Sequence, residues 1–361
     1  MTKVVRLVFE HPRTVFRDLP ARKTEGRQWS VEVYWVGGVF FRKFVSLRYM
    51  FRMKALRNIA LAVILLSLVG CGGKSTRGNK EALSLRLGAM SSVDYVPFAI
   101  AEHMGINDSL GLDVEMIKFF SANDRDAAFR TGEIDGTVID FTGAALQHAG
   151  GIPLALVMKH DGVFELMAKG FDSLEGLKGK RIAISRNTVI EYATDRILAE
   201  AGLSESDITK IEINKIPLRM EMLLAGEIDG SVFPDPFALI SKSKGATALI
   251  STKSMGFSVT GTMFTAEAIE TKAEAIRTLL HGYNLAVDYM RTHPRSTWMH
   301  VLVEDAGFPQ EVAERVVLPE YTHAQLPEPK DMEATIAWLK AKGLVPDSYN
   351  GEGLIESSLL P

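Results

Sequence analysis

The sequence predicts an α/β protein built from two similar lobes. From residue 83 onward, short apolar segments alternate with amphipathic ones, as strands alternate with helices around a largely parallel sheet. The motif at residues 132–138 (GEIDGTV) recurs 94 residues later at 226–232 as GEIDGSV. In both copies we expect a helix to end and a short strand to lead to an aspartate, Asp140 or Asp235. Two lobes built alike would face each other across a cleft.

The first round of the alternation covers residues 83–158. It opens with a strand in which leucines alternate with polar residues up to Gly88, followed by a helix over 93–104 that Gly105 ends. The other elements expected in this round are strands at 113–119, 136–140 and 154–158 and helices at 124–131 and 143–149.

The second round covers residues 181–251. Its first helix, 188–201, repeats small and apolar residues every four positions, and Gly202 ends it. Thr188 and Glu191 form a capping box at its start, which favours a structural role for Glu191. The other elements expected here are strands at 181–185, 208–214, 230–233 and 248–251 and helices at 217–225 and 237–244.

Charge separates the first 70 residues from the rest of the chain. Residues 1–70 carry 13 Lys/Arg and 4 Asp/Glu, whereas residues 71–361 carry 28 and 40. The acidic main part argues against nucleic-acid binding, which requires a basic surface, so we expect no nucleic-acid partner. Cys71 is the single cysteine, which excludes an intrachain disulfide and a cysteine-based zinc site.

Cys71 follows a segment typical of exported proteins. Residues 59–69 are apolar and uncharged but too short to span a bilayer, and Lys54 and Arg57 precede them. The junction Leu68-Val69-Gly70-Cys71 resembles the lipobox of bacterial lipoproteins. The resemblance implies a signal peptide at 53–70 and a lipid anchor on Cys71. The protein would then be extracytoplasmic, on the periplasmic side in a Gram-negative cell; a buried helix with a chance cysteine is the alternative.

Two segments flank this signal. Met50 and Met53 would each place a short basic stretch directly before the apolar run, so we expect residues 1–52 to be a mis-assigned start or a disordered extension. Residues 31–35 within it have the composition of a strand but no evident partner segment. Residues 71–82 are polar and rich in glycine, which predicts a flexible tether.

Five short segments of the mature chain carry a family resemblance. They are Ser91-Ser92 with residues 97–101 (PFAIA), residues 130–135 (RTGEID), 174–183 (LEGLKGKRIA), 223–230 (LLAGEIDG) and 234–236 (PDP). In this order they resemble the type II periplasmic substrate-binding proteins of ABC importers. The group that they resemble most is the one that binds nitrate, sulfonates, taurine and thiamine-pyrimidine precursors.

The resemblance implies a fold and a role. Each lobe would hold a mixed sheet, a hinge of two strands would join the lobes, and the ligand would lie in the cleft between them. Residues 83–171 with 254–361 would form lobe one, and residues 172–253 lobe two. The protein would be a monomer that closes around a small molecule, because the ligand contacts both lobes, and would deliver it to a membrane permease with a separate ATPase.

Candidate ligand-binding residues end strands or open helices, where ligands of such sheets bind. The two serines at 91 and 92 either cap a helix or hold a ligand oxygen, or do both. The candidates are Ser91, Ser92, Asp94, Tyr95, Asp140, Thr142, Gly143, Arg186, Asn187, Thr188, Tyr192, Phe233 and Asp235.

The aspartates among these candidates bear on the ligand. Asp94, Asp140 and Asp235, with aromatic residues nearby in the sequence, suit a ring that carries amino donors. A simple sulfonate would instead prefer amides, hydroxyls and arginine. This favours an aminopyrimidine-like or other nitrogenous ligand and leaves a sulfonate, taurine or nitrate open, since aromatic residues on such strands are often core residues.

Catalytic motifs are absent from the sequence. It contains no Gly-x-Ser-x-Gly elbow, phosphate-binding loop or His-Glu-x-x-His helix. The seven histidines after residue 71 show no ligand spacing, and His103 is expected to complement the dipole at a helix end. We therefore expect no cofactor, no metal and no enzymatic activity. The alternative is an enzyme on the same fold, a pyrimidine synthase or a dehydratase, which would need no export signal.

Overall fold

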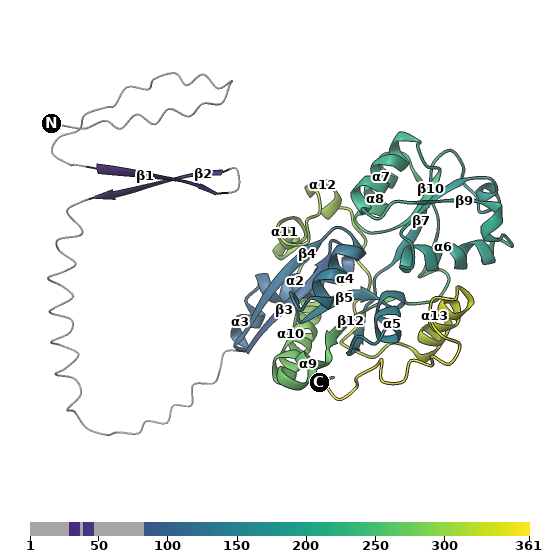
Figure 1. Ribbon diagram of the computed structural model, residues 1–361. Coiled ribbons are helices and arrows are strands. Elements are labelled where there is room, and N and C mark those ends of the chain that lie inside the picture. The colour runs from purple at the N-terminus through teal and green to yellow at the C-terminus, as the bar shows by residue number, and fades with distance from the viewer. Residues whose placement is uncertain (1–28, 37–38, 47–82) are drawn as a thin grey trace, which may run out of the picture. The chain divides into compact units, whose positions relative to one another are not determined.

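The computed structural model describes residues 29–36, 39–46 and 83–361 (Figure 1). Contacts divide the chain into two units, Met1–Asn79 and Lys80–Pro361. In the first unit, β1 (Trp29–Val36) and β2 (Val39–Ser46) pair as antiparallel strands. The expectation that this strand-like segment has no partner is therefore wrong. The missed signal is the Gly-Gly pair that separates two β-rich runs, which is typical of a hairpin.

Three predictions concern residues outside the described ranges. They are the signal peptide at 53–70, the lipid on Cys71 and the tether at 71–82. Among the residues that the structure does describe, no helix combines the length and the apolar character needed to cross a membrane.

The first sheet of the second unit has the strand order β4-β3-β5-β12-β6. Its strands are β3 (Leu83–Met90), β4 (Leu112–Phe119), β5 (Gly136–Asp140), β6 (Leu154–Lys159) and β12 (Thr260–Thr265). β3 runs parallel to β4 and β5, whereas β12 runs antiparallel to β5 and β6. The carboxyl ends of β3, β4 and β5 therefore meet at one edge of the sheet.

The second sheet has the order β11-β7-β10-β8-β9. Its strands are β7 (Phe164–Ala168), β8 (Arg181–Ile184), β9 (Thr209–Glu212), β10 (Gly230–Pro234) and β11 (Thr247–Ser251). β8 is parallel to β9 and β10, and β7 is antiparallel to β10 and β11. Both sheets are thus mixed, as predicted, and each contains one strand that opposes the others.

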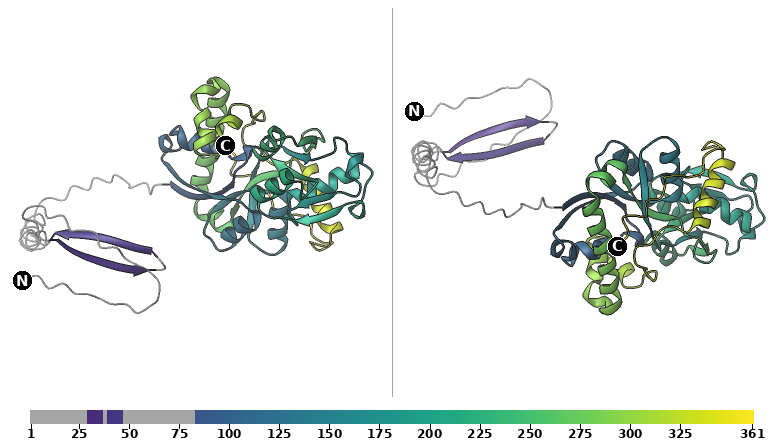
Figure 2. Two further views of the ribbon diagram at one scale, coloured as in Figure 1. Left: turned by 90° about the horizontal axis from the view of Figure 1, so that it is seen from above. Right: turned by 90° about the horizontal axis from the view of Figure 1, so that it is seen from below.

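Helices cover both sheets. Around the first sheet lie η1 (Val93–Tyr95), α2 (Val96–His103), α3 (Ile106–Ser109), α4 (Ala122–Arg130), α5 (Phe141–Ala149), α9 (Ala266–Thr271), α10 (Ala273–Thr292), η4 (Arg295–Thr297), α11 (Met299–Glu304), α12 (Gln310–Ala313) and α13 (Pro329–Ala341). The second sheet carries η2 (Glu175–Leu177), α6 (Val189–Glu200), η3 (Glu205–Asp207), α7 (Ile216–Ala225) and α8 (Phe237–Ser243). The long helix α10 (green) lies alongside the first sheet (Figure 2). It buries Ile276, Leu280, Tyr283 and Val287, which share one helical face.

The chain crosses between the sheets twice. One crossing joins β6 to β7 and the other joins β11 to β12, and His160 N donates to Thr260 O between them at 2.8 Å. β7 belongs to the second sheet, so the first crossing precedes residue 164, earlier than the expected boundary after residue 171. The difference arises because β7 fills the place between β10 and β11, a pairing of segments far apart in sequence. We call the first sheet with its helices lobe one and the second lobe two.

Helix α13 contacts both lobes. Its Leu339 is buried in the core of lobe one, whereas Trp338 Nε1 donates to Asp195 of α6 at 2.9 Å. Lys342 lies 2.9 Å from the same carboxylate and also pairs with Glu205. The carboxylates that gather here are neutralised by lysines, so their cluster is explained by ion pairing.

Candidate functional site

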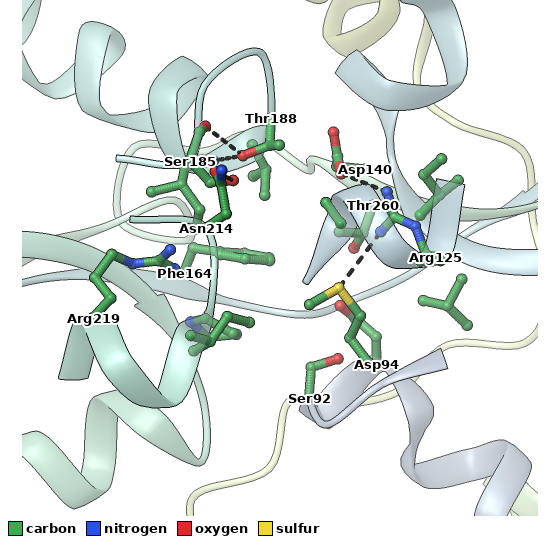
Figure 3. Close-up of a pocket in the computed structure, with 18 residues that line it drawn as sticks. Ser92, Asp94, Arg125, Asp140, Phe164, Ser185, Thr188, Asn214, Arg219 and Thr260 are labelled. Atoms are coloured by element: carbon green, nitrogen blue, oxygen red, sulfur yellow. Dashed lines mark hydrogen bonds and ion pairs between the residues drawn. The ribbon is translucent and has the colours of Figure 1, made fainter. Parts of the chain in front are cut away.

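A cleft lies where the carboxyl ends of strands from both lobes meet. The space between the two walls is about 540 Å³ when the open solvent at its mouth is included. Figure 3 shows side chains of the two lobes facing each other across it. The polar residues that line the cleft are Ser92, Asp94, Arg125, Asp140 and Thr260 from lobe one and Ser185, Thr188, Asn214 and Arg219 from lobe two.

On the wall of lobe one, Asp140 is engaged by the protein itself. It ends β5 and caps α5, because its Oδ1 accepts a hydrogen bond from Gly143 N at 2.8 Å and another from the Thr142 hydroxyl. Its Oδ2 lies 3.4 Å from Arg125 Nη2, and Arg125 also pairs with Asp126 at 2.8 Å. Although burial lowers the pKa of Arg125, the two carboxylates together raise it above its ordinary value. Arg125 is therefore neutralised by the protein's own carboxylates and needs no ligand as a counter-ion.

Asp140→Ala should lower the stability of the ligand-free protein by about 2 kcal/mol. The change removes the cap of α5 and one of the two carboxylates that neutralise the buried Arg125. Urea denaturation measures the loss. Asp140→Asn keeps a capping oxygen and should recover part of the lost stability. If Asp140→Ala is as stable as the wild type, the cap and the ion pair contribute little to the stability of the protein.

On the wall of lobe two, Arg219 has no charged partner among the residues that the structure describes. Its side chain is fully buried, and its guanidinium extends toward the cleft beside Phe164 (Figure 3). Nη1 donates to Ile213 O at 2.8 Å, while Nε and Nη2 have no hydrogen-bond partner. Burial alone lowers its pKa to about 9, so it remains a cation at neutral pH. The ring of Phe233 lies 5.2 Å from the guanidinium carbon.

Asp94 lies between the cleft and the hinge. It is 2% exposed, and its Oδ1 lacks a hydrogen-bond partner of good geometry. Burial raises its pKa to about 7, against the opposing effects of nearby Thr260 and the Gly162 backbone. A Cβ on Gly162 would overlap the Asp94 carboxylate, so only glycine fits at this point of the hinge. Asp94 therefore touches both hinge crossings and faces the cleft.

The structure brings four of the predicted residues together at the cleft: Ser92, Asp94, Asp140 and Thr188. Gly143, Arg186 and Asn187 line a neighbouring depression instead, together with Asp140 and Thr188. Arg186 pairs there with Glu212 at 3.1 Å, and Asn187 adopts a left-handed backbone with φ 62°.

The other predicted residues do not line the cleft. Tyr95, Tyr192 and Phe233 are buried in the cores, because aromatic side chains behind the strand ends fill the space between sheet and helices. Thr142 is buried within the cap of α5, and Asp235 Oδ1 accepts from Leu239 N at the start of α8. Ser91 precedes the cleft residue Ser92 but is not part of the lining.

Both arginines of the cleft were missed by sequence reasoning, although a signal for them exists. Arg219 stands between Ile216 and Leu223, at the spacing of the buried face of α7. Arg125 stands in the same relation to Ala122 and Phe129 on α4. A lone arginine at an apolar helical position indicates a buried charge that needs a partner. Ser185, Asn214 and Thr260 were also missed.

Comparison with known proteins agrees with this geometry. Residues 78–301 match the model of the NMT1-like family. The chain belongs to the NMT1-like family. A Bacillus subtilis protein described as binding aliphatic sulfonates is 24% identical over 252 residues, which are 65% of this chain and 74% of the relative.

Solved structures share the fold. The alkanesulfonate-binding protein SsuA from Xanthomonas axonopodis has a TM-score of 0.66 and 20% identity, with 76% of this chain and 99% of that chain covered. The periplasmic aliphatic sulphonate-binding protein SsuA from Escherichia coli has a TM-score of 0.64 and 17% identity, with 76% of this chain and 92% of that chain covered. The periplasmic nitrate-binding protein NrtA from Synechocystis has a TM-score of 0.64 and 14% identity, with 74% of this chain and 83% of that chain covered.

These relatives confirm two predictions. The two-lobe fold of a periplasmic binding protein is confirmed by the structures, and the resemblance to the nitrate, sulfonate and taurine group is confirmed by the family match together with the relatives. All of these relatives are described as binding proteins, and SsuA from Escherichia coli and NrtA are described as periplasmic.

Proposed function

We propose that this protein is an extracytoplasmic receptor of an ABC importer that binds a small organic anion, such as a sulfonate, between its lobes. The observation that carries the proposal is Arg219, a fully buried cation that faces the cleft without a carboxylate partner. A buried charge without a partner costs several kcal/mol. An anionic ligand would supply that partner and contact both lobes at once.

The charge balance of the cleft favours an anion over the nitrogenous ligand. Asp140 is paired with Arg125 and caps α5, and Asp235 lies outside the lining, so two of the three aspartates are not free for an amino group. Asp94 lines the same cleft, and a carboxyl group there suits an amino or hydroxyl substituent on the same anion. An aminopyrimidine ligand remains an outcome of the test.

The ligand class is tested by a thermal-shift screen of the full chain against nitrate, methanesulfonate, taurine and an aminopyrimidine. A ligand at 100 times its Kd adds about 2.7 kcal/mol of stability. We expect stabilisation by one or more of the anions. A response to the aminopyrimidine alone would overturn the ligand class, and conversion of a compound into a product would favour the alternative of an enzyme on this fold.

The mature protein would act as a monomer, held at the membrane by lipid on Cys71, and would pass its ligand to a permease with a separate ATPase. The lipobox-like junction supports the anchor, and two or more acyl chains hold a protein stably where one does not. Cys71→Ser should move the protein from the membrane to the soluble fraction, as measured by fractionation and immunoblotting. Continued membrane association would count against lipidation.

A further inference from the structure

Two histidines far apart in sequence meet on the surface of lobe one. His103 ends α2 and His300 is the second residue of α11. Their Nε2 atoms are 2.9 Å apart, and the ring planes are inclined at 67°. On the other side of the His103 ring, Nδ1 lies 2.8 Å from Asp305 Oδ2. Neither histidine lines the ligand cleft.

The packing beneath the two rings holds them in place. Ile100 and Ala101 of α2 and Val301 and Leu302 of α11 are buried in the same hydrophobic core. The His103 side chain is 31% exposed, so water and ions reach the rings from outside. The site is therefore accessible, and the helices that carry it do not depend on closure of the lobes.

The carboxylate of Asp305 favours one tautomer of His103. Its negative charge, 2.8 Å from Nδ1, attracts the ring proton to Nδ1, so the lone pair is on Nε2, which faces His300. A carboxylate that orients a histidine in this way is typical of metal sites in proteins. Two imidazole nitrogens that bind one ion at about 2.0–2.1 Å in tetrahedral geometry are about 3.4 Å apart, so the rings need to separate only slightly.

We propose that His103 and His300 bind a divalent transition-metal ion, Zn²⁺ or Cu²⁺, with Asp305 as the positioning residue. The ion takes the place of the His300 proton that lies between the two Nε2 atoms. Water moves this proton to Nδ1 of His300, so both rings stay neutral and each offers the lone pair of its Nε2. Water completes the coordination shell. Imidazole ligands favour Zn²⁺ and Cu²⁺ over Ca²⁺ and Mg²⁺, which prefer oxygen. Bound metal links α2 to α11 and stabilises lobe one.

The carboxylates of Glu191, Asp195 and Glu205 also lie close together, but they do not make a comparable site. Lys210 and Lys342 pair with all three. The two ammonium groups occupy the positions from which a cation would be bound, whereas no ammonium group separates the two Nε2 atoms.

Titration calorimetry with ZnCl₂ on the untagged full chain tests the site. We expect one Zn²⁺ to bind the wild type, at least tenfold weaker binding for His103→Ala and His300→Ala, and binding about 10–100-fold weaker for Asp305→Asn. His281→Ala removes an exposed histidine of α10 and should bind Zn²⁺ as the wild type does. Unchanged Zn²⁺ affinity in both histidine variants, or no binding by the wild type up to millimolar Zn²⁺, would overturn the proposal.

Electron paramagnetic resonance of the Cu²⁺-loaded wild type gives an answer that does not depend on the variants folding. Coupling to two imidazole nitrogens is the expected signature, and coupling to none contradicts the site. Thermal melts without metal should show that the histidine variants are folded, since both positions are at the surface.

Discussion

Arg219→Met should weaken ligand binding about 30-fold or more and at the same time raise the stability of the ligand-free protein. Methionine has a similar length and removes a buried cation whose Nε and Nη2 have no partner. The anionic ligand loses its charged contact, which costs about 2–5 kcal/mol, or about 30-fold or more in affinity. Calorimetry with the anion found in the screen and urea denaturation without ligand measure the two effects.

The opposite signs of these effects separate a binding role from a structural one. A structural arginine would lose stability on substitution and leave binding little changed, and that outcome would refute the proposed role of Arg219. Arg186→Met is the matched control, because Arg186 is exposed, pairs with Glu212 and lies outside the cleft. We expect it to change stability by no more than about 0.5 kcal/mol.

Local sequence signals predicted most elements between residues 83 and 251, whereas no bounds were predicted for the strand and helices that follow residue 251. β5 has the predicted bounds, and helix ends at Gly105 and Gly202 follow from residues that act within one or two positions. β7 was not predicted, because its five residues show no clear alternation and its place is set by pairing with β10 and β11. The pairing of β1 with β2 could have been predicted from its two-glycine connection.

The site was predictable only in part, for a related reason. Ser92, Asp94 and Asp140 were candidates because each lies at or after the end of a strand, and all three line the cleft. It could not show that Arg125, from another element, neutralises Asp140, or that Arg219 has no such partner. Which charges are free depends on contacts between segments distant in sequence. The same holds for His103 and His300, which lie 197 residues apart.

Asp94→Asn should make the protein more stable at pH 8, by up to about 4 kcal/mol, and change little at pH 4. Burial raises the pKa of Asp94 to about 7 in the folded protein, from an ordinary value of 3.8. Between these two values the unfolded chain loses the proton while the folded protein keeps it, so wild-type stability falls as the pH rises. Above pH 7 the cost is fully present, and asparagine removes it.

Urea denaturation of the wild type and Asp94→Asn across pH 4–8 measures this slope. Asp172→Asn, at an exposed position, controls for the loss of one negative charge. His160 gives the opposite slope, because burial lowers its pKa to about 3 and stability is lost as the pH falls below 6.5. The Asp94→Asn variant should still become less stable as the pH falls, because His160 is unchanged. Its stability should no longer decline as the pH rises toward 8. If both proteins decline equally toward pH 8, Asp94 is already ionised in the folded state at pH 4, and this prediction is wrong.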